Sequence, residues 1–168
     1  MTIDKLHKLE YFLKHCEIVS LLANRPDREH PAVKHHIRSA IREVSNHVAI
    51  APGSAKHSAQ YISHSAQQAM EANQCNDLIA EHVVPVSILN IKVMELEHPT
   101  PESIAEIMLS YTMRAVITSE EDSKLKSLGF QKTMPNTNNM DNLCSRYDAA
   151  GISLTENNYS QLLKKCKA

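Results

Sequence analysis

The fold is decided by the stretch Asp77-Leu78-Ile79-Ala80-Glu81-His82-Val83-Val84-Pro85, an apolar run that carries an acid and a histidine side by side. Pro85 indicates the end of a strand, because proline cannot donate a hydrogen bond to a sheet ladder. A second apolar run, Ala115-Val116-Ile117-Thr118, opens onto the acidic helix start Ser119-Glu120-Glu121-Asp122. These stretches predict two strands followed by a helix, an arrangement that would bring the acids of both stretches together.

Helices account for most of the remaining chain, because apolar residues recur at steps of three and four, the spacing of one helical face. Proline in the first turn favours helix starts at Pro31 and, after a Thr100 cap, at Pro101. The other helices are predicted over 2–24, 55–74, 86–96, 119–129, 140–149 and 158–165. The sequence therefore predicts a mainly helical α+β fold with a small central two-stranded β-hairpin followed by a helix.

The chain of 168 residues falls in the size range of one domain, so we expect a single domain over 1–168. Within it we expect a helical arm over 1–74, a core over 75–155 with inserted helices, and a C-terminal helix within 156–168. Charged residues interrupt the apolar residues from Met1 to Leu22, which argues against a signal peptide or a membrane span. We therefore expect a soluble, cytoplasmic protein.

The charge balance carries little information about partners. Eighteen basic residues against nineteen acidic ones leave a formal net charge of −1, so any contact with nucleic acid must come from a local patch. One such patch is the basic side of the second helix, with His35, His36, Arg38 and Arg42. An ordinary solvated helix face is the interpretation we favour for them, with contact to phosphates as the alternative. The four cysteines form no CxxC pair, which argues against a zinc ribbon.

The run Glu81-His82-Val83-Val84-Pro85 resembles the end of the first strand in the HNH, or ββα-metal, nucleases, where an acid and a histidine precede two apolar residues and a proline. The run from Val116 to Asp122 is similar to the second strand and helix start of that family, with aspartate where histidine is usual. The resemblance covers residues 77 to 126 and implies a ββα-metal fold for that part of the chain.

The resemblance implies a site for one divalent cation, magnesium or manganese. Glu81 and Asp122 would be metal ligands, with Glu121 as the reserve ligand, and carboxylates suit such hard cations. His82 would be the general base that takes a proton from water. The implied function is a metal-dependent endonuclease that hydrolyses phosphodiester bonds in DNA or RNA, with DNA as the expected partner.

Two basic residues outside this region are further candidates. Lys132 and Arg146 are expected to hold a phosphate of the substrate, and arginine suits bidentate contact with it. A surface loop and a helix end are the alternatives for these two positions. For Glu81 and His82, the alternative is a structural pair at a strand end. For the whole chain, the alternative function is that of a non-enzymatic helical interaction or regulatory protein, which retains a degenerate nuclease-like module and binds a protein partner.

Overall fold

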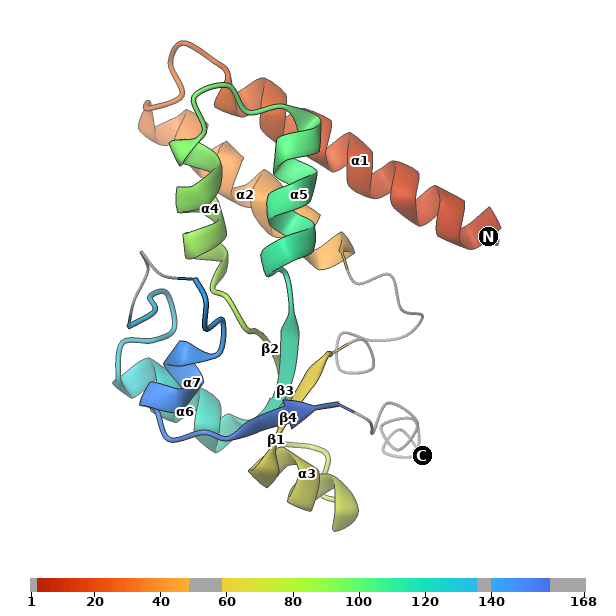
Figure 1. Cartoon of the computed structure of the whole chain (residues 1–168), viewed down its shortest axis with the longest axis vertical. Helices are drawn as coiled ribbons and strands as arrows, with labels where there is room; N and C mark the ends of the chain where they lie inside the picture. The colour runs from red at the N-terminus through yellow and green to blue at the C-terminus, as the bar shows by residue number, and fades with distance from the viewer. Residues whose placement is uncertain (1–2, 49–58, 136–139, 158–168) are drawn as a thin grey trace. The chain divides into compact units, whose positions relative to one another are not determined.

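The computed structural model describes residues 3–48, 59–135 and 140–157. These residues form seven α-helices and one four-stranded sheet, so the prediction of a mainly helical α+β fold is confirmed (Figure 1). Within the described ranges, every helix is too short or too polar to cross a bilayer.

The helices and strands of the described residues are interspersed along the chain. The helices are α1 Ile3–Ala23, α2 Pro31–His47, α3 His64–Glu71, α4 Val86–Glu95, α5 Pro101–Tyr111, α6 Ser119–Ser127 and α7 Ser145–Ala149. The strands are β1 Tyr61–Ser63, β2 Leu78–His82, β3 Arg114–Thr118 and β4 Leu154–Glu156.

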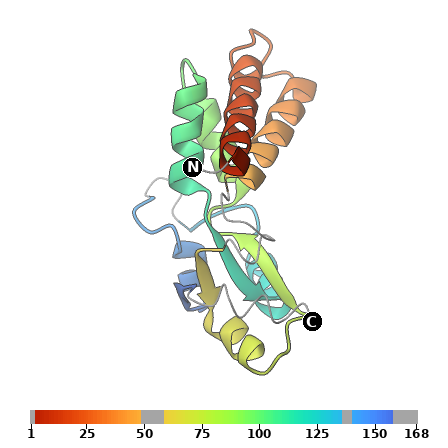
Figure 2. The same cartoon turned by 90° about the vertical axis from the view of Figure 1, so that its right-hand side faces the viewer.

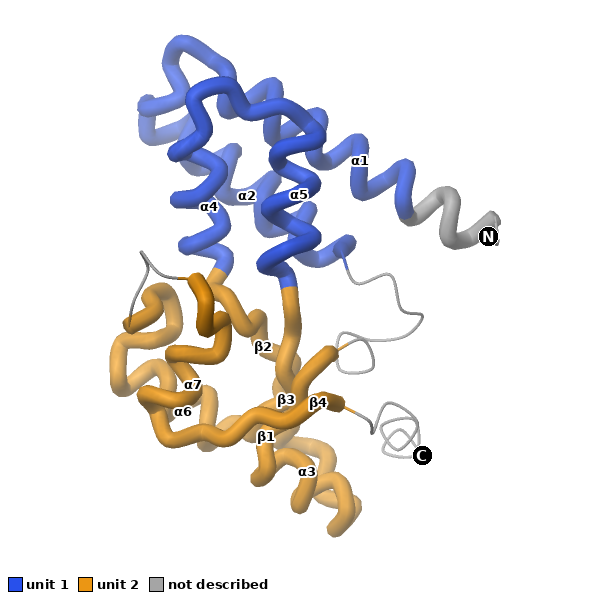
Figure 3. The backbone as a smooth tube through the Cα atoms, viewed as in Figure 1, with its two compact units in different colours: residues 1–50, 86–112 blue, residues 51–85, 113–168 orange. Residues whose placement is uncertain are grey.

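The chain divides into two compact units, each built from two segments of sequence (Figure 3). Unit 1 comprises residues 1–50 and 86–112, and unit 2 comprises residues 51–85 and 113–168. The helices inserted between β2 and β3 therefore group with the N-terminal helices. This grouping differs from the predicted division into an arm over 1–74 and a core over 75–155.

Unit 1 is a bundle of the four helices α1, α2, α4 and α5 (Figure 2). Helix α1 packs against α2 and α5, and α4 packs against both α2 and α5. Thr100 caps α5 in a reciprocal arrangement with Ser103, as its position before Pro101 predicts. The hydroxyl of Ser20 on α1 donates to the carbonyl of Pro99 at 2.8 Å, which ties α1 to the start of α5.

Unit 2 is built on the sheet, whose strand order is β2-β3-β1-β4. The predicted pair β2 and β3 is antiparallel, with Leu78 opposite Thr118 at one end and His82 opposite Arg114 at the other. Strand β1 runs parallel to β3 and antiparallel to β4. The sheet therefore contains the predicted strand pair and two further strands that the sequence patterns did not indicate.

The two faces of the sheet are covered by different helices. One face packs Ile62, Leu78 and Val116 against Ala66 and Met70 of α3. The opposite face carries its own apolar cluster, to which α6 contributes Leu125 and α7 contributes Tyr147. The other buried members of this cluster are Val83, Ala115, Ile117, Ala150 and Ile152. Since side chains alternate along a strand, neighbouring residues of β2 belong to different faces.

Several predicted boundaries are wrong. The predicted helix over 55–74 contains β1, and α3 begins only at His64, where the Ser63 hydroxyl accepts from the Ala66 amide at 3.1 Å. Helix α7 is shorter than the predicted 140–149. Thr118, rather than Ser119, is the N-cap of α6. The predicted helix over 158–165 lies outside the described residues.

Candidate functional site

Glu81 and His82 face opposite sides of the sheet. Both lie in β2, which pairs with β3 residue by residue up to His82 and Arg114. Their neighbours Ile79 and Val83 pack into the cluster beneath α6 and α7, while Leu78 packs beneath α3. Alternation therefore places Glu81 on the α6 and α7 side and His82 on the α3 side. The regular pairing through His82 does not bring the two side chains to one site, contrary to our expectation.

The Glu81 carboxylate is bound by Arg146 of α7. Arg146 Nη2 lies 3.0 Å from Glu81 Oε1, and the side chains are 0% and 25% exposed respectively. The Arg146 guanidinium also donates from Nε to the carbonyl of Val83 at 3.0 Å and from Nη1 to the carbonyl of Phe130 at 2.8 Å. Arg146 therefore joins the end of β2 to the segment after α6. Its donors are directed to groups inside the fold, which differs from the expected contact with a substrate phosphate.

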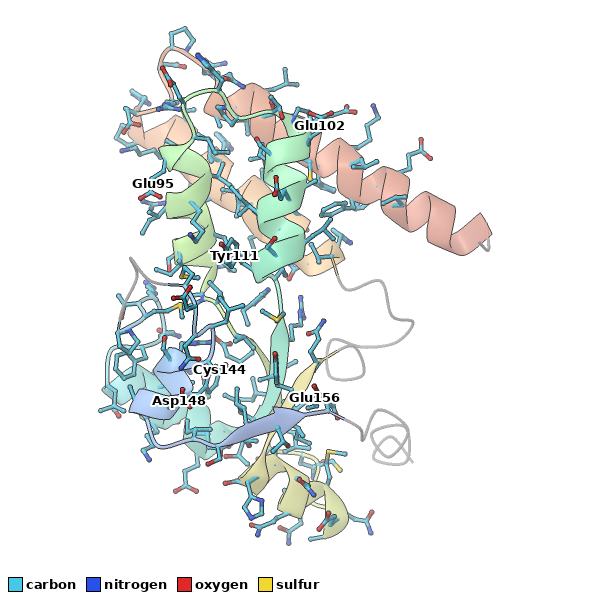
Figure 4. All side chains as sticks on the ribbon, in the orientation of Figure 1. Glu95, Glu102, Tyr111, Cys144, Asp148 and Glu156 are labelled. Carbon is cyan, nitrogen blue, oxygen red and sulfur yellow. The ribbon has the colours of Figure 1, made fainter. Side chains whose placement is uncertain are left out.

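Tyr147 completes this group, which we call the Arg146 cluster: Glu81, Arg146 and Tyr147. Arg146 Nη2 donates to the Tyr147 hydroxyl at 3.0 Å and also to the carbonyl of His82. Burial raises the pKa of the Tyr147 hydroxyl, which keeps it protonated. Cys144 and Asp148 lie at the same short helix (Figure 4), and burial together with Asp148 raises the pKa of the Cys144 thiol.

Asp122 lies near Glu81 but is paired with a lysine of its own helix. Lys126 Nζ is 2.5 Å from Asp122 Oδ2, one turn along α6, and the Asp122 side chain is 14% exposed. The hydrogen bond and charge of Asp122 raise the pKa of Lys126, and Glu81 adds a smaller effect in the same direction. The two predicted carboxylate ligands thus both act on the Lys126 amine, and Asp122 has the larger effect on its pKa.

Glu121, the reserve ligand, holds the start of α6. Its Oε2 accepts from the Thr118 amide at 2.9 Å, and the Thr118 hydroxyl accepts from the Glu121 amide at 3.2 Å, which makes a capping box. The same carboxylate oxygen accepts from the Ser63 hydroxyl at 2.6 Å. Glu121 therefore joins β1 to the start of α6.

A pocket of about 420 Å³ lies at the N-terminal end of α6. Of the predicted site residues, Glu121 lines it, whereas Glu81, His82, Asp122, Lys132 and Arg146 do not. Its lining is otherwise made of Ser65, Ala69, Gln74, Asp77, Leu78, Thr118, Ser119, Glu120, Lys124, Gly151 and Ile152. Lys132 is exposed on the segment after α6. Among the described residues, the predicted site residues therefore do not converge on this pocket.

The arrangement does not fit the divalent cation that the family resemblance implies. Glu81 accepts from a buried guanidinium, Asp122 is paired with Lys126, and His82 faces the other side of the sheet. Among the described residues, no group of three or more His, Cys, Asp or Glu side chains is placed to hold a metal ion. Both predicted carboxylate ligands therefore already have a cationic partner from the chain itself.

Two residues with a clear role in this region were missed by sequence reasoning. Lys126 follows Asp122 by four residues, a spacing that predicts an ion pair on a helix, so the signal was available. Ser63 gave no such signal, because its contact with Glu121 crosses 58 positions of sequence.

Comparisons of the chain with protein-family models, with curated proteins and with solved structures give no match. Function is therefore argued from the residues alone.

Proposed function

We propose that the chain is a non-enzymatic interaction protein that binds another protein through the outward side of α1. The observation that carries this proposal is the distribution of apolar residues around that helix. A buried stripe faces the bundle, and further large apolar residues lie on the opposite side. A helix that is apolar on several sides is usually covered on several sides.

The buried stripe of α1 consists of Phe12, Cys16, Val19 and Ala23, each no more than 4% exposed. The side chains that we call the α1 outer stripe are Ile18 and Leu21, which are 45% and 72% exposed. Helical spacing places these two roughly opposite the buried stripe. Tyr11 is also exposed, but its ring lies edge-on to the His47 ring of α2, with 4.6 Å between the centroids. Among the described helices, α2 and α5 make the main contacts with α1, and Ile18 and Leu21 stay exposed beside them.

Exposed apolar side chains concentrate in unit 1 more widely. The large apolar residues with high exposure are Leu9, Tyr11, Leu13, Ile18, Leu21, Ile91, Leu109 and Leu128, and all but Leu128 belong to unit 1. Contiguous exposed apolar surface is a mark of protein–protein contact, whereas scattered single residues need no explanation. The concentration on one unit supports a binding surface there.

Unit 2 supports the same proposal from its polar groups. Each carboxylate that the nuclease resemblance assigns to the site has a structural partner instead. Glu81 binds Arg146, Asp122 binds Lys126, and Glu121 completes the cap of α6. Satisfied buried polar groups of this kind specify and stabilise a fold. In this proposal unit 2 keeps a strand-strand-helix module for its structure rather than for catalysis.

The test replaces apolar side chains of the outer stripe by acids. Ile18→Glu with Leu21→Glu is compared with Leu128→Glu, which introduces the same chemistry at an exposed leucine of unit 2, 48% exposed. Partners are captured by crosslinking in the native cell and identified, and the affinity of the purified pair is then measured. Far-UV circular dichroism verifies that both variants fold.

The proposal predicts that the identified partner, or a second copy of the chain seen by sedimentation, loses at least tenfold in affinity with the outer-stripe variant. The Leu128→Glu control should bind as the wild type does. Equal affinity of the outer-stripe variant and the control would overturn the proposal.

A metal-dependent nuclease is the second candidate, and one observation favours it. Strand β2, strand β3 and α6 occur in the order that the family resemblance implies, with Glu81 and Asp122 both acting on Lys126. Cleavage of plasmid DNA with magnesium or manganese, lost on Asp122→Asn and on His82→Ala, would support this candidate. Intact plasmid with the wild-type protein would remove it.

A further inference from the structure

The outward face of α2 carries basic side chains in a stripe. The helix buries Ile37, Ile41 and Val44, while Arg38 and Arg42 are exposed and lie one turn apart on the same face. His35 precedes Arg38 by three residues and extends the stripe by a further turn. We call His35, Arg38 and Arg42 the α2 basic stripe.

The two arginines of this stripe differ from the other cations of unit 1 in how they are paired. Among the described residues, no ion pair, hydrogen bond or ring contact of the Arg38 or Arg42 guanidinium is found. The remaining described lysines and arginines of the unit are engaged: Lys14 with Glu17, Arg25 with Asp27, Arg28 with two carbonyls, Lys34 with Glu29, and Lys92 over the Tyr111 ring (Figure 4).

The acids nearest in sequence are directed to other partners. Glu43 Oε2 lies 3.8 Å from Nε2 of His47, one turn along α2. Glu29 Oε2 lies 2.5 Å from Nζ of Lys34. Two like charges at positions i and i+4 of a helix repel each other by a few tenths of a kcal/mol. The fold thus keeps two guanidinium groups side by side without a counter-charge, and an anionic ligand would supply one.

We propose that the α2 basic stripe binds the phosphate backbone of double-stranded DNA. A planar guanidinium matches a phosphate through two parallel hydrogen bonds, and two of them one turn apart, about 6 Å along the axis, can engage successive positions of a backbone. Ser39 lies between them on the exposed side and adds a hydroxyl, a common donor to phosphate. This inference goes beyond the proposed protein-binding function and does not depend on it.

Duplex DNA fits this surface better than two other polyanions. The B-form major groove, about 12 Å wide, admits an α-helix, whereas the major groove of RNA duplexes is too narrow for side-chain access. Peripheral binding to an anionic membrane needs an apolar helix face that enters the lipid. The apolar side of α2, with Ile37 and Ile41, is fully buried in the bundle.

The test measures binding of the full chain to a fluorescent DNA duplex by anisotropy, in EDTA, over a series of salt concentrations. EDTA removes divalent metal, so the outcome does not depend on the nuclease candidate. Arg38→Gln with Arg42→Gln is compared with Lys14→Gln with Arg25→Gln, which removes the same charge from exposed cations outside α2 that already have partners. Parallel measurements use duplex RNA and vesicles of phosphatidylglycerol with phosphatidylcholine.

We expect the wild type to bind the duplex with a dissociation constant on the order of 10⁻⁴ to 10⁻⁶ M at physiological salt. The stripe variant should reduce the slope of log affinity against log salt by about one for each arginine, and the control should keep the wild-type slope. Absence of binding at low salt, equal loss in both variants, or tighter binding to RNA or to vesicles would overturn the inference.

Discussion

Replacing Arg146 by leucine should severely destabilise unit 2. The change removes the guanidinium donors to the Glu81 carboxylate and to the carbonyls of His82, Val83 and Phe130. Removing one partner of a buried ion pair costs about 3–5 kcal/mol, and each buried acceptor left unsatisfied costs about 1–3 kcal/mol. These costs are not additive, because the structure relaxes, so we expect a loss of about 4 kcal/mol or more.

That loss is a large share of the stability of an ordinary domain, which is about 5–15 kcal/mol. Urea unfolding followed by far-UV circular dichroism measures it, and hydrogen exchange of the β2 amides assigns it to unit 2. Arg146→Lys keeps the charge and should fall between the wild type and Arg146→Leu, which provides a measurable variant if the leucine variant does not fold. Glu81→Gln keeps an acceptor and should cost less than Arg146→Leu.

Lys132→Leu serves as the control, since Lys132 is exposed and surface changes usually fall within about 0.5 kcal/mol. If Arg146→Leu unfolds within about 1 kcal/mol of the wild type, the structural role assigned to the Arg146 cluster is refuted. A substrate role for Arg146 would then regain support, most of all if the variant lost a nuclease activity.

Three further predictions follow from individual side chains. Burial raises the pKa of the Cys16 thiol from 9.0 to about 11, so the folded state holds this proton more tightly than the unfolded state does. The free energy of unfolding should therefore fall as pH rises from about 9 to about 11. Unfolding curves across this range measure the effect, and Cys16→Ala should remove the pH dependence that this thiol contributes. Thr118→Ala should cost about 1 kcal/mol through loss of the α6 cap, while Thr118→Ser should stay near wild type in the same urea assay. Burial raises the pKa of Tyr147, so ultraviolet titration should show one tyrosine that ionises only on alkaline unfolding, a signal absent from Tyr147→Phe.

The sequence was informative where the patterns are long and local. The run before Pro85 and the run ending at Thr118 predicted a strand pair, and both strands occur with the expected partner. Helix α5 follows its Thr100 cap and Pro101 as predicted. Such signals depend on a few neighbouring residues and need no tertiary information.

The missed strands are short. β1 and β4 each contain three residues, too few for an alternating pattern to stand out from a helical one. The spacing of Ala59, Ile62 and Ala66 suits one face of a helix, although Ile62 lies in a strand and α3 begins only at His64. Pairing between β1 and β3 connects residues far apart in sequence, which no local pattern reveals.

The candidate site was misjudged for a different reason. The order of residues resembles that of a ββα-metal module, but the orientation of Glu81 and His82 depends on whether β2 contains a bulge. Strand β2 pairs regularly up to His82. The partner of Glu81 is Arg146, 65 positions away, so the sequence offered no means to connect them.

The most direct test of the claim that the acids of unit 2 serve the fold is the response of backbone amide NMR signals to manganese. A bound paramagnetic ion broadens signals near it, so an ion held by Glu81 and Asp122 would mark β2 and α6. We predict that signals of β2 and α6 broaden no more than those elsewhere in the chain at low manganese concentration. Selective broadening around Glu81 and Asp122 that disappears in Asp122→Asn would contradict this account.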